Sequence, residues 1–173
     1  MIIREEKPDD IDAVHQVVKQ AFEKAEHTDH DEHNLVDRLR KSDAFIPELS
    51  LVAEENGKII GHILLSKLKV GETVQLALAP LSVLPECQKQ GIGGKLIMAG
   101  HSKAKEMGYE YAILLGHAAY YPRFGYFPAS RIGVKAPFDV PDELFMAFNL
   151  QGKNTVLNAV VEYPQAFFDG PGA

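Results

Sequence analysis

Residues 81–96 read LSVLPECQKQGIGGKL, and they carry more chemical information than any other part of the sequence. An apolar strand end, Leu81–Leu84, leads into a short polar turn, and glycines then open a helix. A helix N-terminus leaves several backbone N–H groups unpaired and carries a partial positive charge. Glycines there allow an anion to approach the backbone without meeting a Cβ. The stretch therefore predicts a phosphate-binding turn.

Two common phosphate motifs do not fit this stretch. A Walker A loop requires a glycine where Lys89 stands and a serine or threonine where Leu96 stands. The dinucleotide pattern G-x-G-x-x-G also requires a glycine at position 96. The pattern that fits is Gln-x-x-Gly-x-Gly, formed by Gln88, Gly91 and Gly93 directly after a Val-x-Pro strand end.

On these residues the sequence resembles the GCN5-related N-acetyltransferase (GNAT) superfamily. The segment Tyr120-Tyr121-Pro122-Arg123-Phe124-Gly125-Tyr126 is similar to one found in a branch of bacterial predicted N-acetyltransferases. The resemblance implies that backbone amides of the loop bind the pyrophosphate of acetyl-CoA and that the preceding strand pairs with the pantetheine arm. It also implies that the reaction does not require a bound metal ion. The implied cofactor-binding residues are Leu81, Ser82, Val83, Gln88, Lys89, Gln90, Gly91, Ile92, Gly93, Gly94 and Lys95.

The resemblance also implies the catalytic groups of a direct acetyl transfer to an amine. Many members place a tyrosine four residues before the Gly-aromatic pair, where it acts as the general acid for the CoA sulfur. In this sequence that tyrosine is Tyr121, four residues before Gly125. Tyr120 is the alternative if the register slips by one, and the tyrosines of this segment could instead belong to an aromatic core patch. The backbone N–H of Val83 is the candidate oxyanion donor.

The general base is not evident from the sequence. Residues 81–84 offer no carboxylate, and Ser82 is their only polar side chain. In place of a carboxylate, a chain of water molecules or His117 could accept the proton of the amine. Cys87 has no identifiable activating partner, so we expect it to be a bystander.

A histidine- and acid-rich segment, residues 26–33, is the third feature. A metal site is one interpretation. The other is a solvated loop and helix start, capped by Asp29 or Asp31. Acids in this region could also attract a cationic acceptor. The histidines of the metal interpretation are His27, His30 and His33, and the acids that could attract an acceptor are Glu26, Asp29 and Asp31.

Composition bounds the class of protein. A chain of 173 residues with 46% hydrophobic and 24% charged residues is typical of one globular domain. We expect a core over about residues 1–150, with a C-terminal strand and tail over 151–173. A net charge of −6 argues against a nucleic-acid partner. The polar N-terminus, the single cysteine and the absence of a long apolar run favour a cytoplasmic protein without disulfides or membrane contact.

Periodicity and turn residues predict a mixed α/β (α+β) fold in a single domain. The resemblance further implies a mostly antiparallel central sheet, flanking helices and a splayed central strand pair. Pro80 falls inside a predicted strand, so a bulge or broken pairing is expected there. Predicted helices cover 8–22, 31–40 and 91–107, with a turn or short helix at 118–124. Predicted strands cover 2–4, 49–53, 58–68, 74–84, 111–115, 144–150 and 156–163.

Two functions compete with acetyl transfer: a non-catalytic or regulatory CoA-binding module, and a phosphate-ligand site unrelated to CoA. The acceptor is a small-molecule amine or a protein amine, and a homodimer is possible by resemblance.

Overall fold

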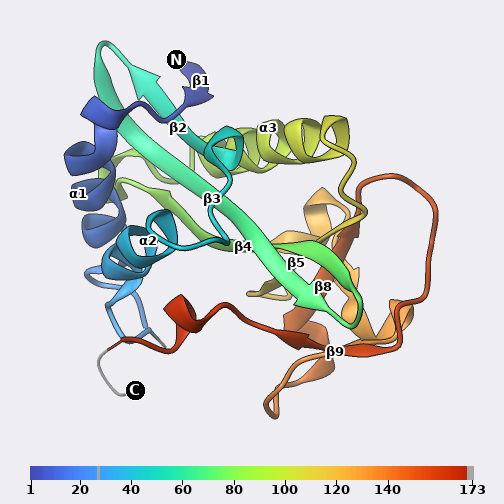
Figure 1. Ribbon diagram of the computed structural model, residues 1–173. Helices are drawn as coiled ribbons and strands as arrows, with labels where there is room; N and C mark the ends of the chain where they lie inside the picture. The colour runs from blue at the N-terminus through green and yellow to red at the C-terminus, as the bar shows by residue number, and fades with distance from the viewer. Residues whose placement is uncertain (27, 171–173) are drawn as a thin grey trace.

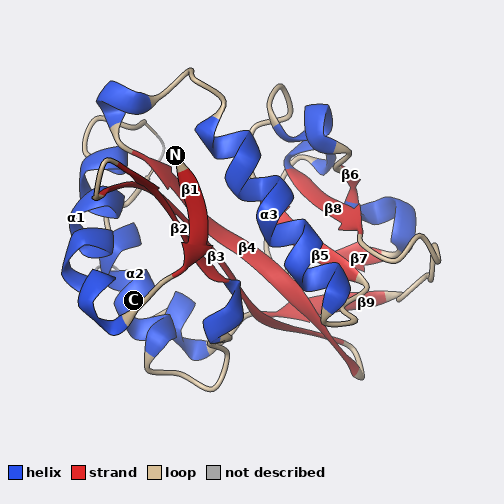
Figure 2. Cartoon of the chain, turned by 90° about the horizontal axis from the view of Figure 1, so that it is seen from above, coloured by secondary structure: helices blue, strands red, loops and turns tan. Residues whose placement is uncertain are grey.

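The computed structural model describes residues 1–26 and 28–170, and within them a nine-stranded sheet has helices on both faces (Figures 1 and 2). Helices α1 (Ile11–Phe22) and α2 (Glu32–Arg40) cover one face, and α3 (Ile92–Glu106) covers the other. The strand path is β1-β2-β3-β4-β5-β8-β6, and β9 pairs with both β3 and β7. The strands are β1 (Ile2–Glu5), β2 (Ser50–Glu55), β3 (Lys58–Val70), β4 (Thr73–Val83), β5 (Tyr111–Leu115), β6 (Phe127–Pro128), β7 (Val134–Lys135), β8 (Phe145–Asn149) and β9 (Ala159–Glu162).

Local sequence signals explain the N-terminal half. Pro8–Asp10 forms one 3₁₀ turn that leads directly into α1, as proline and acidic residues favour. Asn56 and Gly57 form the two-residue turn between β2 and β3, with φ angles of 52° and 78°. These positive angles match the twist of a tight hairpin. The predicted hairpin is confirmed.

The predicted irregularity at Pro80 is also confirmed. In the antiparallel β3–β4 ladder, Ile63 faces Leu81 whereas Leu65 faces Leu78, so β4 carries one extra residue across this step. An extra residue of this kind is a β-bulge, which bends the strand and redirects its free edge.

The central strand pair is splayed, as expected. β5 runs parallel to β4 but pairs with it only at Leu76–Ala112 and Ala77–Ile113. Beyond Ala77, β4 continues to Val83, and no strand of the described residues pairs with it on that side. The sheet therefore opens between the C-terminal ends of β4 and β5, which is where α/β folds commonly place ligands.

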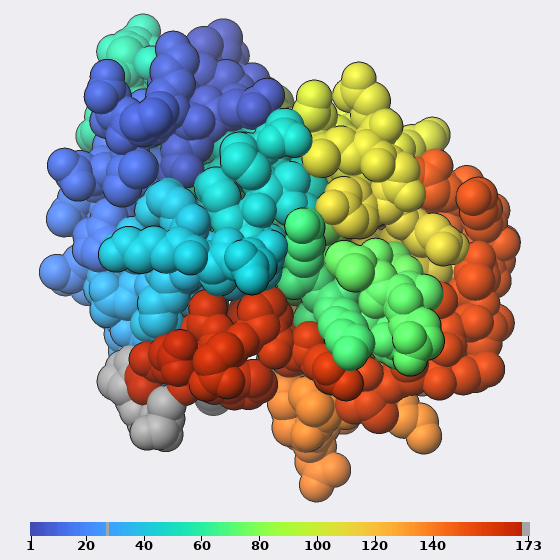
Figure 3. Space-filling view, in the orientation of Figure 1, coloured from blue at the N-terminus to red at the C-terminus, as the bar shows by residue number. Residues whose placement is uncertain are grey.

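The C-terminal part differs from the sequence-based expectation. The strand predicted over 156–163 is shortened to Ala159–Glu162, and it pairs with the far end of β3, where Val161 faces Val70. β6 and β7 were not predicted, since two residues are too short to show a period. Figure 3 shows the C-terminal segment lying against α2 and the tip of the β3–β4 hairpin. The helix predicted over 91–107 ends at Glu106, and Met107, which follows it, is 37% exposed.

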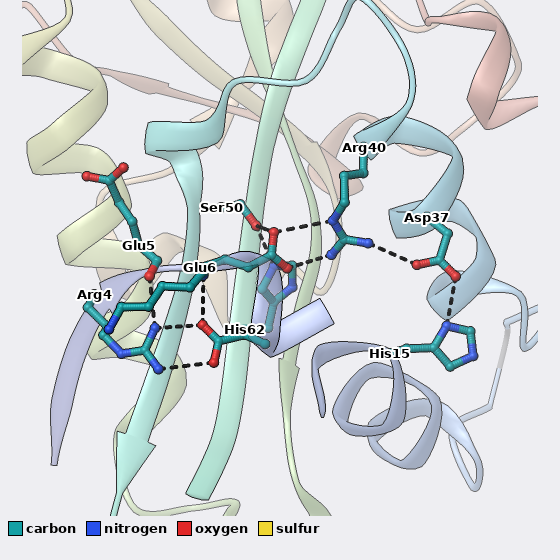
Figure 4. A network of polar contacts seen from close by, with 10 residues as sticks. Arg4, Glu5, Glu6, His15, Asp37, Arg40, Ser50 and His62 are labelled. Carbon is teal, nitrogen blue, oxygen red and sulfur yellow. Dashed lines mark hydrogen bonds and ion pairs between the residues drawn. The ribbon is translucent and has the colours of Figure 1, made fainter. Parts of the chain in front are cut away.

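A network of buried polar side chains connects the sheet to α1 and α2 (Figure 4). Arg40 is bonded to Glu6 at 2.5 Å and to Asp37 at 3.0 Å, and Asp37 in turn contacts Nδ1 of His15 at 2.8 Å. Glu6 and Arg40 are almost completely buried, with side-chain exposures of 6% and 13%. A buried charge requires a partner, so these residues fix the position of α2 on the sheet.

The same network extends to a fully buried histidine on β3. His62 Nε2 lies 2.9 Å from Ser50 Oγ, which also donates to Glu6. Burial lowers the pKa of His62 to about 3, and the nearby Arg40 charge acts in the same direction. His62 is therefore neutral at physiological pH.

None of the helices in the described residues is both long and apolar enough to cross a membrane.

Candidate functional site

A cleft of about 860 Å³ lies between the end of β4, the turn that follows it and the first turn of α3. Its fourth wall comes from the segment after β5. We call this cleft the donor cleft. It is lined by Leu81, Val83, Cys87, Gln88, Lys89, Gly91, Ile92, Gly93, Gly94, Lys95, Met98, Tyr120, Arg123 and Phe124. Nine of the eleven residues predicted to bind the cofactor, all except Ser82 and Gln90, therefore meet at one surface.

The free edge of β4 presents backbone groups to this cleft. The N–H of Leu84 donates to the carbonyl of Ile60 on β3 at 2.9 Å, so Leu84 and Ile60 form a hydrogen-bonded pair. The adjacent pair in this ladder is Val83 opposite Gly61. Hydrogen-bonded pairs alternate along an antiparallel ladder, so the N–H and C=O groups of Val83 point away from β3. Gln88 Nε2 donates to this Val83 carbonyl at 3.1 Å. The Val83 N–H therefore faces the open edge of β4.

The turn that follows adopts conformations suited to anion binding. Lys89 and Gly91 have φ angles of 63° and 82°, and Gly91 is the N-cap of α3. Alternation of left- and right-handed residues directs successive N–H groups into one concavity. Nothing lies within 4 Å of the place where a Cβ of Gly91 would be, so this backbone is open to a ligand. A non-glycine residue at positive φ, such as Lys89, costs free energy and commonly marks a functional turn.

The charge of the cleft is opposite to that of the chain. Lys89, Lys95 and Arg123 line it, and no carboxylate of the part of the chain that the structure describes does, although the chain carries a net charge of −6. Lys95 lies in the first turn of α3, which contains no acidic residue. A cation there opposes the helix dipole unless an anion is bound nearby. Arg123, which the sequence analysis did not assign, lies 4.7 Å from the centroid of the Tyr120 ring.

Gly93 and Gly94 also have a steric role that the sequence did not predict. A Cβ on Gly93 would lie 2.7 Å from the Tyr120 hydroxyl, and a Cβ on Gly94 would lie 2.8 Å from Phe124 Cε1. Aromatic side chains fill the space on the side where a Cβ of either glycine would lie. The absence of side chains there allows the segment after β5 to pack onto α3 and close the cleft. The sequence shows the glycines at 93 and 94 and the aromatic residues at 120 and 124, but nothing in it indicates that the two groups are in contact.

The two candidate tyrosines occupy different positions. Tyr120 lines the donor cleft, whereas the Tyr121 ring packs edge-on against Tyr120 at 5.0 Å and against Tyr126 at 5.6 Å. A Cβ on Gly116, which follows β5, would meet the Tyr121 ring at 2.5 Å. Burial raises the pKa of Tyr121, and Tyr120 adds to the effect. Burial also raises the pKa of Tyr120, which Arg123 partly offsets. Both phenols are therefore protonated at neutral pH.

The remaining predicted residues are less suited to chemistry. The Ser82 side chain is 1% exposed on the face opposite the cleft, and its Oγ has no partner among the described residues. Gln90 and His117 are exposed outside the lining of the cleft. Cys87 lines the cleft and is half-buried.

The segment 26–33 is organised by contacts within the protein. Asp31 is the N-cap residue of α2, but its side chain makes no capping hydrogen bond to the helix, contrary to the expectation. It is 5% exposed and bonded to Arg38 at 2.9 Å, so it has no free charge to offer a cationic acceptor. His30 Nδ1 contacts the Phe22 carbonyl. No group of three metal-ligating side chains occurs in the described residues, and His27 lies outside them.

Comparison with known proteins agrees with this site. Residues 11–126 match the acetyltransferase (GNAT) family. The chain is 40% identical over 117 residues to the uncharacterised N-acetyltransferase YjhQ of Escherichia coli K12, covering 65% of each chain. It is 32% identical to the uncharacterised N-acetyltransferase YhbS of the same strain, covering 96% of this chain and 98% of YhbS.

Solved structures give the same result. A GNAT family acetyltransferase from Brucella melitensis, crystallised in complex with acetyl-CoA, superposes with a TM-score of 0.81 and 34% identity, covering 96% of this chain and 97% of that one. The complex of E. coli YhbS with CoA has a TM-score of 0.88 and 26% identity, with coverage of 98% and 93%. The chain therefore belongs to the GNAT acetyltransferase family, and the predicted family and fold class are confirmed.

Proposed function

We propose that the donor cleft binds acetyl-CoA and that the protein transfers the acetyl group to an amine. The observation that carries this proposal is electrostatic: three cationic side chains and open backbone N–H groups surround a cleft without carboxylates in an acidic chain. CoA supplies the matching ligand, because it has a pyrophosphate, a further phosphate and a long neutral arm. The first turn of α3 and residues 88–91 hold the pyrophosphate.

The free edge of β4 aligns the pantetheine arm. Its outward-facing N–H and C=O groups can pair with the amides of the arm as a neighbouring strand would. The Val83 N–H then lies at the edge along which the thioester arrives and stabilises the developing oxyanion. Gln88 supports this role by holding the Val83 carbonyl, and thus the orientation of the peptide group.

Tyr121 is the proposed general acid, and Tyr120 is the alternative. In the reaction the amine nitrogen attacks the thioester carbon, the N–C bond forms and the C–S bond breaks. One proton leaves the nitrogen for water, and the Tyr121 phenol protonates the departing sulfur and is reprotonated from solvent. Burial raises the pKa of Tyr121, so its phenol is protonated at neutral pH and has a proton to donate.

Calorimetric titration tests the donor site. Acetyl-CoA and CoA should bind more tightly than ADP, which lacks the pantetheine arm, and binding should weaken as salt is added. Lys89→Ala and Arg123→Ala should each raise the acetyl-CoA Kd by about five- to tenfold, as expected for partly exposed charged contacts. Lys153→Ala is the matched control, because this exposed lysine lies outside the cleft.

Three outcomes separate the candidate functions. Binding of both CoA species with thiol release on amines supports the proposed transferase. CoA binding without thiol release on any amine supports the non-catalytic CoA-binding module instead. Equal affinity for ADP and CoA would contradict a CoA site and favour a ligand recognised by phosphate alone. A cytoplasmic location and a homodimer stay predictions of the sequence.

A further inference from the structure

A second cavity, of about 300 Å³, lies where β4 and β5 separate. It begins at the last paired residues, Ala77 and Ile113, and continues along the unpaired ends of both strands. The C-terminal part of the chain completes its wall. Among residues 1–26 and 28–170, no charged side chain lines it. We call it the aromatic pocket, after the side chains of Phe138, Tyr163, Phe167 and Phe168.

The aromatic pocket opens on the face of the sheet opposite the donor cleft. The 3₁₀ turn Gln165–Phe167 is held against α2, because Arg38 Nε donates to the Ala166 carbonyl at 2.9 Å. Figure 3 shows this C-terminal segment beside α2. The donor cleft lies at the first turn of α3, and Figure 2 shows α2 and α3 on opposite faces. The two cavities thus approach the gap between β4 and β5 from opposite sides.

Tyr121 lies near a residue that lines each of the two cavities. Its ring contacts Tyr120 of the donor cleft at 5.0 Å. Its ring is also close to Leu114, which lines the aromatic pocket. A Cβ built on Gly116 would lie 2.5 Å from the Tyr121 ring and 3.2 Å from Leu114 Cδ1, so the two side chains flank the same glycine. A nucleophile in this pocket would therefore reach the gap next to the proposed acid.

We propose that the aromatic pocket binds the acceptor and selects small primary amines with an aromatic or branched aliphatic body. This inference rests on the proposed transfer of an acetyl group. The rings of Phe138 and Tyr163 are stacked, with centroids 6.4 Å apart, and Tyr163 and Phe167 are 4.9 Å apart. Such walls favour apolar and aromatic groups. The volume is at the lower end for small-molecule sites, which fits a compact ligand.

The lining also argues against other amine classes. A polyamine or an aminoglycoside carries several charges that carboxylates must neutralise, and none lines the pocket. An amino acid would need a cationic partner for its carboxylate, which the lining also lacks.

The apolar lining gives a reason why no carboxylate base is found beside the thioester. Burial disfavours the charged form of an amine, so the pKa of a bound ammonium group falls and the neutral nucleophile is favoured. The proton can then pass to water as the amine enters. The pocket thus combines recognition of the acceptor with its activation.

A panel of amines tests the inference. Initial rates of CoA release are measured with 2-phenylethylamine, 3-methylbutylamine, putrescine, spermidine and glycine. The two apolar amines should give kcat/KM values at least tenfold above those of the other three. Saturation-transfer NMR in the presence of CoA reports binding of 2-phenylethylamine independently of turnover.

Variants locate the site. Phe138 and Phe168 are 45% and 50% exposed, so Phe138→Ala and Phe168→Ala should fold normally. Each should raise the KM for 2-phenylethylamine about fivefold and leave the acetyl-CoA Kd unchanged. Val156→Ala, at an exposed apolar residue outside the pocket, is the matched control and should change neither value.

The possible failures are distinguishable. Preference for putrescine or spermidine, or an unchanged KM in both phenylalanine variants, would overturn the assignment of the pocket while acetyl-CoA binding remains intact. Absence of both turnover and NMR contact with the apolar amines would overturn it in the same way. Loss of acetyl-CoA binding in the wild-type protein would instead contradict the proposed function itself.

Discussion

The hydroxyl of Tyr120 lies 2.7 Å from the position that a Cβ on Gly93 would occupy. This contact joins two motifs that are far apart in the sequence, and it closes the donor cleft over the first turn of α3. It also gives glycine at position 93 a steric requirement that an isolated helix start would not impose.

Gly93→Ala should destabilise the protein by about 1 kcal/mol. Alanine improves helix propensity by up to about 1 kcal/mol, but overpacking against Tyr120 costs about 1–3 kcal/mol. The double variant Gly93→Ala/Tyr120→Phe should reverse the sign, because the next neighbour of the new Cβ, Leu81 Cδ2, is 3.7 Å away. Urea unfolding measures both. Simple additivity of the two substitutions would show that the contact is not made.

Tyr121→Phe should lower kcat by about 100-fold and leave the acetyl-CoA Kd unchanged, because it removes a proton donor but not the packing of the ring. Tyr120→Phe should show the opposite pattern, with a weakened acetyl-CoA affinity and a retained kcat. Steady-state kinetics and calorimetry on the two variants distinguish the roles. An unaltered kcat in Tyr121→Phe together with a lowered kcat in Tyr120→Phe would exchange the assignments.

The pH dependence of kcat adds an independent test of the acid. Burial raises the pKa of Tyr121 above the ordinary value of 10, so the phenol stays protonated through the basic range. The rate with a neutral amine should therefore not fall between about pH 8 and pH 10. A decline with an apparent pKa near 8 would contradict a tyrosine acid in this environment.

Stability should decrease on acidification because two histidines are buried in the neutral form. Burial lowers the pKa of His62 to about 3 and that of His101 to about 4. Below about pH 6.5 the unfolded chain binds these protons and the native protein does not, so each histidine reduces stability by about 1.4 kcal/mol per pH unit until its folded pKa is approached.

The measurement is urea unfolding at about pH 7.5 and about pH 5, with His62→Gln as the comparison. Other titrating groups contribute equally to both proteins, so the difference between their pH dependences isolates His62. The wild type should lose about 2 kcal/mol more than the variant over this interval. Identical losses would mean that His62 is protonated in the native state.

Arg40→Ala should cost about 3 kcal/mol, because it leaves the buried Glu6 carboxylate without its cation. Lys41→Ala, at the neighbouring exposed position, should change stability by no more than about 0.5 kcal/mol. Combining Arg40→Ala with Glu6→Gln should recover part of the loss, since the charge no longer lacks a partner. Thermal or chemical unfolding tests the series, and equal effects at positions 40 and 41 would exclude a structural role for the network in Figure 4.

Features fixed by neighbouring residues could be read from the sequence. The Asn56-Gly57 turn, the start of α1 after Pro8 and the helix start at Gly91 each depend on backbone angles that those residues favour. The bulge at Pro80 follows equally from a missing N–H donor. The turn at residues 88–91, which we propose holds the pyrophosphate, was identifiable for the same reason, because its conformation depends on consecutive residues.

Features that depend on contacts between distant segments required the tertiary structure. Pairing of β9 with β3, the approach of Tyr120 to Gly93, and the aromatic wall supplied by Phe138, Tyr163 and Phe167 join segments whose separation carries no local signal. Sequence motifs thus determined the family and the glycine-rich turn through short-range conformational preference. Only packing, which minimises exposed apolar surface across the whole chain, decided which tyrosine lines the donor cleft and which side chains surround the aromatic pocket.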